Sequence, residues 1–351
     1  MASSSFRPLP RGPIAPGPYG PGAYSFDVRV PQLPICVVTR SFQLPWEFLN
    51  PSPHSPLVVG FDCEGIELCH NGSLCVMQLA FPNAIYLVDA LFGGLALMNA
   101  CKPALESPYI TKVIHDCKRD SEALYFQFGI KLNNVMDTQI AYTLIEQQEG
   151  RMRLSDDKIS FVGLLADHRY CGVSYHGKEE IRFFIQQDPT FWSYRPMSDL
   201  MVNAAADDVR CLLFVYDRLM ERMTERSMWH LQVRGAMYCR CFCIHEYNRA
   251  EWPPIPPVPD RLKVGWNPPE DEILVIINVP QGKMGLVIGR RGSSILAIKA
   301  SCNCEIIIGG DKGPADKVCL IGPTSEVRKA ESLEGHDETA DTHHRETVSI
   351  D

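Results

Sequence analysis

Two acidic residues, Asp62 and Glu64, lie one residue apart at the end of the apolar run VVGF. In a strand, side chains at i and i+2 point to the same face, so the two carboxylates would project together, about 6 to 7 Å apart. Such charges repel each other unless a cation lies between them, and Mg²⁺ or Mn²⁺ prefers oxygen ligands. A D-x-E pair alone is also typical of a strand end that meets water. Further acids are needed to decide.

Two later segments carry acids where an acid is unusual. Asp120 lies in VIHDCKRDSEAL, where a strand pattern gives way to a helix pattern, and is expected in the first turn of that helix. Asp207 and Asp208 lie in AAADDVRCLL, inside an otherwise apolar, alanine-rich helix pattern. A carboxylate is costly to bury unless it is paired or bound to metal. Together with the D-x-E pair, these acids indicate a metal site.

Four segments in order, FDCE, HDCKRDSEAL, VMDTQIAY and AAADDVRCLL, resemble the DEDD 3′–5′ exonucleases of the ribonuclease D and Werner-exonuclease type, over about residues 57–220. This resemblance implies an α/β domain with an RNase H-like mixed sheet and a two-metal site for Mg²⁺ or Mn²⁺. The catalytic and metal-binding residues that it implies are Asp62, Glu64, Asp120 and Asp208. Asp207 is the metal ligand in an alternative register.

The resemblance also implies a role for each acid. Asp62 would bridge both cations, which activate a water and stabilise the leaving oxygen of a phosphodiester. Glu64 and Asp208 would hold the cation nearer the attacking water. Asp120 would hold the other cation, partly through water.

The sequence departs from the family pattern at one position. These enzymes orient the attacking water with a Tyr four residues before the last Asp, or a His five residues before it. Here those positions hold Ala204 and Asn203. Loss of a positioned base typically lowers the rate about 10²–10⁴-fold. His115 and Asp137 are expected to have structural roles, the latter as a helix cap.

The segment 271–332 predicts strand, helix, turn, helix, strand, strand and helix, and it resembles a type I KH domain. The resemblance implies that a G-x-x-G loop clamps the backbone of about four single-stranded nucleotides. Glycines would let phosphate approach, arginines would add charge, and isoleucines would form an apolar floor for bases. The nucleic-acid-binding residues implied are Ile288, Gly289, Arg290, Arg291, Gly292 and Ile295.

The composition predicts five regions. They are a Pro/Gly-rich leader (1–35), the exonuclease-like domain (36–250), a Pro-rich linker (251–270), a small α+β KH domain (271–332) and an acidic tail (333–351). The whole chain has a net charge of −8. Residues 331–351 hold seven acids and one arginine, a charge of −6, so the first 330 residues carry only −2. The acidity therefore does not exclude nucleic acid as a partner.

Fourteen scattered cysteines, in a chain without a secretion signal, are expected to be reduced thiols. Cys239, Cys241, Cys243 and His245 lack the usual zinc-ligand spacing, so buried helix cysteines are preferred over a zinc site. The sequence has no uninterrupted apolar run of about 18 residues, so it predicts no membrane-spanning helix. We expect a cytoplasmic or nuclear protein, with an organelle as the alternative.

Two functions remain open. The first is a metal-dependent 3′–5′ exonuclease acting on single-stranded nucleic acid, with RNA preferred and single-stranded DNA as the alternative. The KH domain would tether this strand nearby. The second is an RNA-binding adapter whose exonuclease fold is catalytically weak or inactive and offers a surface to protein partners. The four acids favour the enzyme, and Ala204 favours the adapter.

Overall fold

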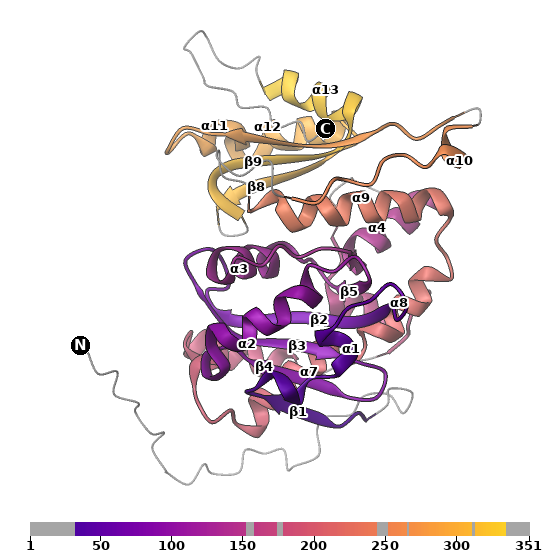
Figure 1. Ribbon diagram of the computed structural model, residues 1–351. Coiled ribbons are helices and arrows are strands. Elements are labelled where there is room, and N and C mark those ends of the chain that lie inside the picture. Colours follow the sequence, from indigo (N-terminus) through magenta and orange to yellow (C-terminus); the bar gives the residue numbers. More distant parts are fainter. Residues whose placement is uncertain are drawn as a thin grey trace.

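A computed structural model of the chain describes residues 32–151, 158–173, 178–243, 252–264, 267–310 and 313–334. Its two layered parts are an α/β domain built on a six-stranded sheet and a smaller α+β domain above it (Figure 1). The predicted mixed α/β fold is confirmed. Most of the predicted leader and acidic tail, and His245, lie outside the described residues, and the predicted domain boundaries remain predictions.

The large sheet has the strand order β1-β4-β3-β2-β5-β6. Strands β2, β3 and β4 form an antiparallel meander, while β5 and β6 continue parallel to β2 and β1 lies parallel to β4. This is the RNase H-like arrangement. The strands are β1 (Ile35–Val38), β2 (Leu57–Ile66), β3 (Ser73–Ala80), β4 (Ile85–Asp89), β5 (Ile110–Ile114) and β6 (Val135–Asp137).

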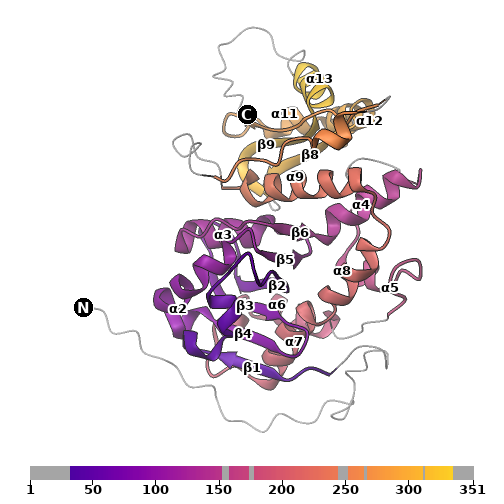
Figure 2. The same ribbon diagram turned by 45° about the vertical axis from the view of Figure 1, so that its right-hand side comes forward.

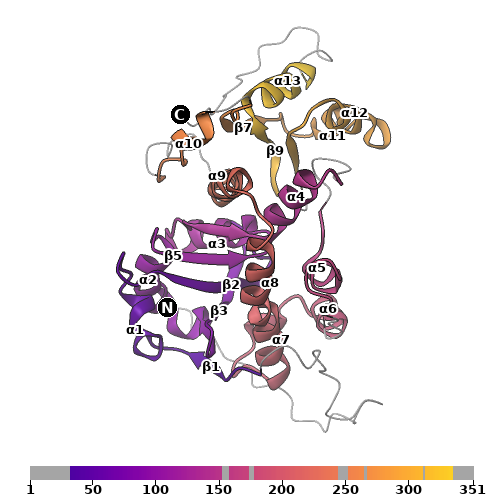
Figure 3. The same cartoon turned by 90° about the vertical axis from the view of Figure 1, so that its right-hand side faces the viewer.

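Helices cover both faces of this sheet. The described helices are η1 (Ser41–Gln43), α1 (Trp46–Leu49), α2 (Ala90–Leu105), α3 (Lys118–Phe128), α4 (Thr138–Gln148), α5 (Phe161–Ala166), α6 (Lys178–Gln187), η2 (Phe191–Ser193), α7 (Asp199–Arg210), α8 (Leu212–Met220), α9 (Glu225–Cys241) and α10 (Asp260–Lys263). Figure 3 shows α1 and α2 on one side and α6, α7 and α8 on the other. The continuous helix pattern predicted for the acids is in fact two helices, because Cys211 separates α7 from α8.

The small domain has the predicted KH order of elements. It comprises β7 (Glu272–Asn278), α11 (Met284–Ile288), the turn η4 (Arg290–Gly292), α12 (Ser293–Ser301), β8 (Glu305–Gly310), β9 (Gly313–Pro323) and α13 (Thr324–Glu334). Its strands form an antiparallel sheet in the order β7-β9-β8. The helices cover one face of this sheet, around residues such as Val275, Ile298 and Leu320.

The other face of the KH sheet packs on α9, the last helix of the large domain (Figures 1 and 2). Leu274, Ile307 and Ile321 from this face belong to the same apolar core as the large domain. One fully buried carboxylate, Glu272, accepts hydrogen bonds from Arg234 of α9 at 2.8 Å and contacts His230 at 2.7 Å. Apolar burial and buried ion pairs therefore hold the two domains together.

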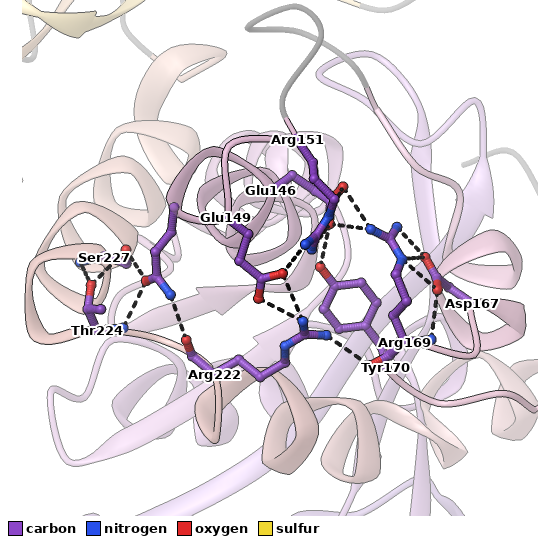
Figure 4. A network of polar contacts seen from close by, with 10 residues as sticks. Glu146, Glu149, Arg151, Asp167, Arg169, Tyr170, Arg222, Thr224 and Ser227 are labelled. Atoms are coloured by element: carbon purple, nitrogen blue, oxygen red, sulfur yellow. Dashed lines mark hydrogen bonds and ion pairs between the residues drawn. The ribbon is translucent and has the colours of Figure 1, made fainter.

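A polar network fixes the C-terminal end of α4 to the turn between α8 and α9 (Figure 4). Glu146 accepts hydrogen bonds from Arg151, Arg169 and Tyr170. Burial raises the pKa of Glu146, but these donors outweigh it and lower the pKa to about 2. Arg222, from that turn, donates to Glu149 at 2.7 Å. The network therefore holds the base of α9, on which the KH domain rests.

The predicted buried thiols at the C-terminal end of α9 and directly after it are confirmed. Cys239, Cys241 and Cys243 are free and buried, and burial raises the pKa of the Cys241 and Cys243 thiols well above the ordinary range. Among the described residues, no group of metal-binding geometry includes these cysteines. No helix in the described part of the chain has the length and apolar character that crossing a membrane requires.

Candidate metal centre and nucleic-acid loop

Asp62, Glu64 and Asp208 come together at one site. Asp62 and Glu64 project from the same face of β2, and Asp208 reaches them from α7, which packs across β2, β3 and β4. One oxygen of each carboxylate lies within 4.8 Å of an oxygen of each of the others. Three negative charges at this spacing repel one another. Such a set of oxygen ligands suits a hard divalent cation. The donor set therefore fits Mg²⁺ or Mn²⁺.

The structure separates the two adjacent acids of α7. Asp207 accepts a hydrogen bond from Arg210 at 2.9 Å, and both side chains are only 4% exposed. Because neighbouring residues of a helix point about 100° apart, Asp208 faces β2 when Asp207 faces away. Ser198 caps the helix by accepting from the Met201 amide. The geometry therefore favours Asp208 as the ligand over the alternative Asp207.

Asp120 occupies the first turn of α3, as predicted, but the structure does not bring it into the three-carboxylate group. Its carboxylate lies against Cys63, the residue between Asp62 and Glu64, and accepts hydrogen bonds from the Cys63 backbone and thiol. Burial raises the pKa of Asp120 to about 7. Its Oδ1 is buried and makes no hydrogen bond. A buried, unpartnered carboxylate oxygen beside an acid cluster is suited to a cation or a bound water.

Asp137 and His115 have the structural roles expected of them. Asp137 caps α4 through the Gln139 amide and also accepts from the amides of Asp116 and Cys117. It thereby fixes the turn that leads into α3. His115 uses both ring nitrogens, at 2.8 Å from Thr138 Oγ1 and 3.0 Å from the Ile159 carbonyl. Neither side chain is placed to orient a water at the three carboxylates.

Ala204 lies one helical turn before Asp208, on the same face of α7. Its side chain is a buried methyl group and can neither accept a proton nor orient a water. Asn203, one residue earlier, carries an amide, which is not a base. Neither position at which the family pattern has a Tyr or a His therefore carries a base in this chain.

The KH loop has a backbone that only glycine adopts easily at two points. Gly289 has φ 73° and Gly292 has φ 81°. A Cβ at Gly289 would also come within 2.3 Å of Ser294 Oγ. Arg290 and Arg291 between them are exposed. The glycines therefore shape the loop directly, and the loop presents two cations on a rigid turn.

One predicted base contact is placed differently by the structure. Ile295 is buried in the KH core, so little of its side chain is available to a base. Ile288 is half-buried beside it. The exposed apolar side chains next to the loop are Leu286 and Leu296. Leu286 is two residues from Ile288 on α11, and Leu296 is next to Ile295 on α12, so each points to a different side of its helix, a distinction that the apolar pattern did not resolve.

Sequence reasoning missed the residues that anchor the far side of the site. Arg195 donates to Asp89 at 2.6 Å and to the carbonyl of Cys75 at 3.0 Å. Cys75 adjoins Val76, which pairs with Glu64 across β2 and β3. These partners are more than 100 residues apart in the chain. The sequence signal that could have found Arg195 is its place in the segment RPMS (195–198), directly before α7.

Comparison with known proteins supports both domains. A family model described as 3′-5′ exonuclease matches residues 38–224, and a second described as KH domain matches residues 274–333. The human piRNA biogenesis protein EXD1 is 34% identical over 168 residues, which cover 47% of this chain and 33% of that protein.

Two further relatives match the same domain. Exosome complex component 10 of Rattus norvegicus is 29% identical over 158 residues, which cover 44% of this chain and 15% of that protein. Ribonuclease D of Gluconacetobacter diazotrophicus is 29% identical over 150 residues, covering 43% and 33%. The chain thus spans a third or less of the length of these relatives. The solved RNase D of Trypanosoma brucei is similar in fold, with a TM-score of 0.51, 21% identity, and coverage of 61% of this chain and 74% of that one.

Proposed function

Because the chain belongs to the 3′–5′ exonuclease family and carries a KH domain, we propose that it is a metal-dependent 3′–5′ exonuclease acting on single-stranded RNA. The observation that carries this proposal is the approach of Asp62, Glu64 and Asp208 to within 4.8 Å of one another. These residues come from two segments of the chain, FDCE and AAADDVRCLL, that the family pattern singled out. Relatives named ribonuclease D and exosome complex component 10 support RNA as the substrate class.

Asp62, Glu64 and Asp208 would hold the divalent cation, and Asp120 would serve a second one through its unpartnered Oδ1. Bound Mg²⁺ or Mn²⁺ supplies a water of lowered pKa and stabilises charge on the phosphodiester oxygens. The chain's own residues hold the acids in place: Asp137 fixes the start of α3, and Arg195 fixes the strand beside Glu64. The KH loop would bind the same RNA strand and raise its local concentration at the acids.

A second candidate, an RNA-binding adapter, is favoured by one observation. Ala204 replaces the residue that would orient the attacking water. The adapter would keep the KH loop and the fold, and turn over RNA slowly or not at all. Both candidates predict RNA binding, so only hydrolysis separates them.

The separating experiment uses a 5′-labelled single-stranded RNA in Mg²⁺ or Mn²⁺, with wild-type protein and Asp62→Ala side by side. A ladder of products shortened from the 3′ end, made only by the wild type, is the expected result. Binding without a ladder in either metal would reject the enzyme and leave the adapter.

Arg290→Asp combined with Arg291→Asp tests the KH loop: weakened RNA binding with an unchanged melting temperature is expected. Unchanged affinity would exclude the loop as the binding site.

A further inference from the structure

Four aromatic residues follow one another in this part of the chain: Phe183 and Phe184 on α6, Phe191 in η2, and Tyr194 directly after it. Helix α6 lies on the side of the sheet that carries α7 (Figure 3). Phe183, Phe184 and Tyr194 are 59%, 38% and 36% exposed. Phe184 stacks on Phe191 with ring centroids 6.2 Å apart and an interplanar angle of 19°. The ring of Phe183 lies 6.0 Å from that of Phe184. We refer to these four residues as the aromatic cluster.

The aromatic cluster is connected through η2 to the strand that carries Asp62 and Glu64. Its η2 segment lies against β2 and β3. Trp192, between Phe191 and Tyr194, is buried. Arg195, the next residue after Tyr194, donates to the Cys75 carbonyl, one residue from the partner of Glu64. The segment that carries Phe191 and Tyr194 is therefore fixed to the strands beside Glu64.

Hydrogen bonds hold the Tyr194 ring in place, which suits a platform for flat ligands. The Tyr194 hydroxyl donates to Asp188 at 2.6 Å, and Asp188 also accepts from Thr190 at 2.6 Å. This fixes the Tyr194 ring on the turn. An exposed aromatic surface that is already ordered loses little conformational entropy when a ligand stacks on it.

We propose that the aromatic cluster stacks bases of the single-stranded RNA whose 3′ end reaches Asp62, Glu64 and Asp208; this rests on the proposed function. Every base has a π-face, so stacking on aromatic side chains binds a single strand without sequence preference. The exposed aromatic surface is small for a protein partner. A stable protein interface takes about 800 Å² from each side, some 20–30 residues, whereas the aromatic cluster exposes three rings. The cluster would hold the strand between the KH loop and the acids.

The test places 2-aminopurine, whose fluorescence is quenched by stacking, at successive positions near the 3′ end of a short single-stranded RNA. Every protein carries Asp62→Ala, so that the readout is independent of hydrolysis. Phe183→Leu with Phe184→Leu removes two exposed rings. The matched control is Trp46→Leu in α1, a ring 73% exposed on the other side of the sheet. Equal melting temperatures confirm that all variants are folded.

Quenching at one or two positions is expected with Asp62→Ala alone and with the control, and its relief is expected in the double Phe variant. With the KH loop disabled by Arg290→Asp and Arg291→Asp, the double Phe variant should bind RNA roughly 5- to 100-fold more weakly. Bound RNA with equal fluorescence in all proteins would overturn the stacking proposal while leaving the proposed function intact. No RNA binding by any protein would instead overturn the proposed function, and this inference with it. Self-association lost only in the double Phe variant would reassign the aromatic cluster to a contact between copies.

Discussion

Asp207 and Asp208 are adjacent, and their neutralisation should move stability in opposite directions. Asp207→Asn leaves Arg210, a 4% exposed guanidinium, without its charged partner. Removing one member of a buried ion pair typically costs about 3–5 kcal/mol. At about 2–4 °C per kcal/mol for a domain of this size, the melting temperature should fall by roughly 10 °C.

Asp208→Asn removes one charge from three carboxylates that approach within 4.8 Å. Repulsion between two unit charges at that distance is about 1 kcal/mol in water and about 3 kcal/mol at an effective dielectric constant near 20. The metal-free protein should therefore become more stable, by a few degrees in melting temperature. It should also lose the stabilisation that a bound cation gives, about 2.7 kcal/mol when the cation is at about 100 times its Kd.

The assay is a thermal melt of each protein with EDTA and with increasing Mn²⁺. Asp207→Asn should melt lower than wild type but keep the Mn²⁺-dependent rise, and Asp208→Asn should melt higher in EDTA and show no rise. The two adjacent substitutions control for each other, since both replace a helical Asp by Asn. A Mn²⁺ response lost in Asp207→Asn and kept in Asp208→Asn would refute the assignment of the ligand.

Three further outcomes follow from the same contacts. Arg234→Met should cost about 3 kcal/mol at pH 7, because it leaves the buried Glu272 carboxylate without its guanidinium, whereas the surface change Arg218→Met should cost under about 1 kcal/mol. Burial raises the pKa of Glu272, but Arg234 and His230 lower it to about 2. The ionised carboxylate therefore contributes to stability above pH 4.5, and this contribution is lost as the pH falls towards 2. Urea titrations should show a smaller difference in unfolding free energy between wild type and Arg234→Met at pH 4 than at pH 7. Ala204→Tyr should raise the rate of RNA shortening about 10²–10⁴-fold if only the positioned base is missing, and an unchanged rate in a folded variant would count against that explanation. Asp120→Asn should stabilise the metal-free protein by about 4 kcal/mol at pH 8 and not at pH 4, because the raised pKa of Asp120 penalises its charged form only as the pH rises from 3.8 through about 7; an equal melting temperature at pH 8 would contradict this.

Local patterns were sufficient for the parts of the fold that are settled by neighbours in the chain. The alternation of Asp62 and Glu64 placed both carboxylates on one face of a strand, and Asp137 marked a helix cap, as the structure confirms. The Gly-Arg-Arg-Gly sequence also predicted the KH loop, because the backbone conformations of its glycines depend on the loop itself and not on distant segments. The resemblance to the family then put the acids in order.

Contacts between distant segments were decided only by the tertiary structure. Asp208, rather than Asp207, faces β2 because of the way α7 is rotated about its axis. Asp120 lies against Cys63 because of the place at which α3 meets the sheet. Packing of the KH sheet on α9 depends on the Glu272–Arg234 pair and on an apolar face that the strand pattern cannot assign to a partner. The physical reason is common to all three: a periodic pattern shows which face of an element is apolar, but not which surface that face will meet.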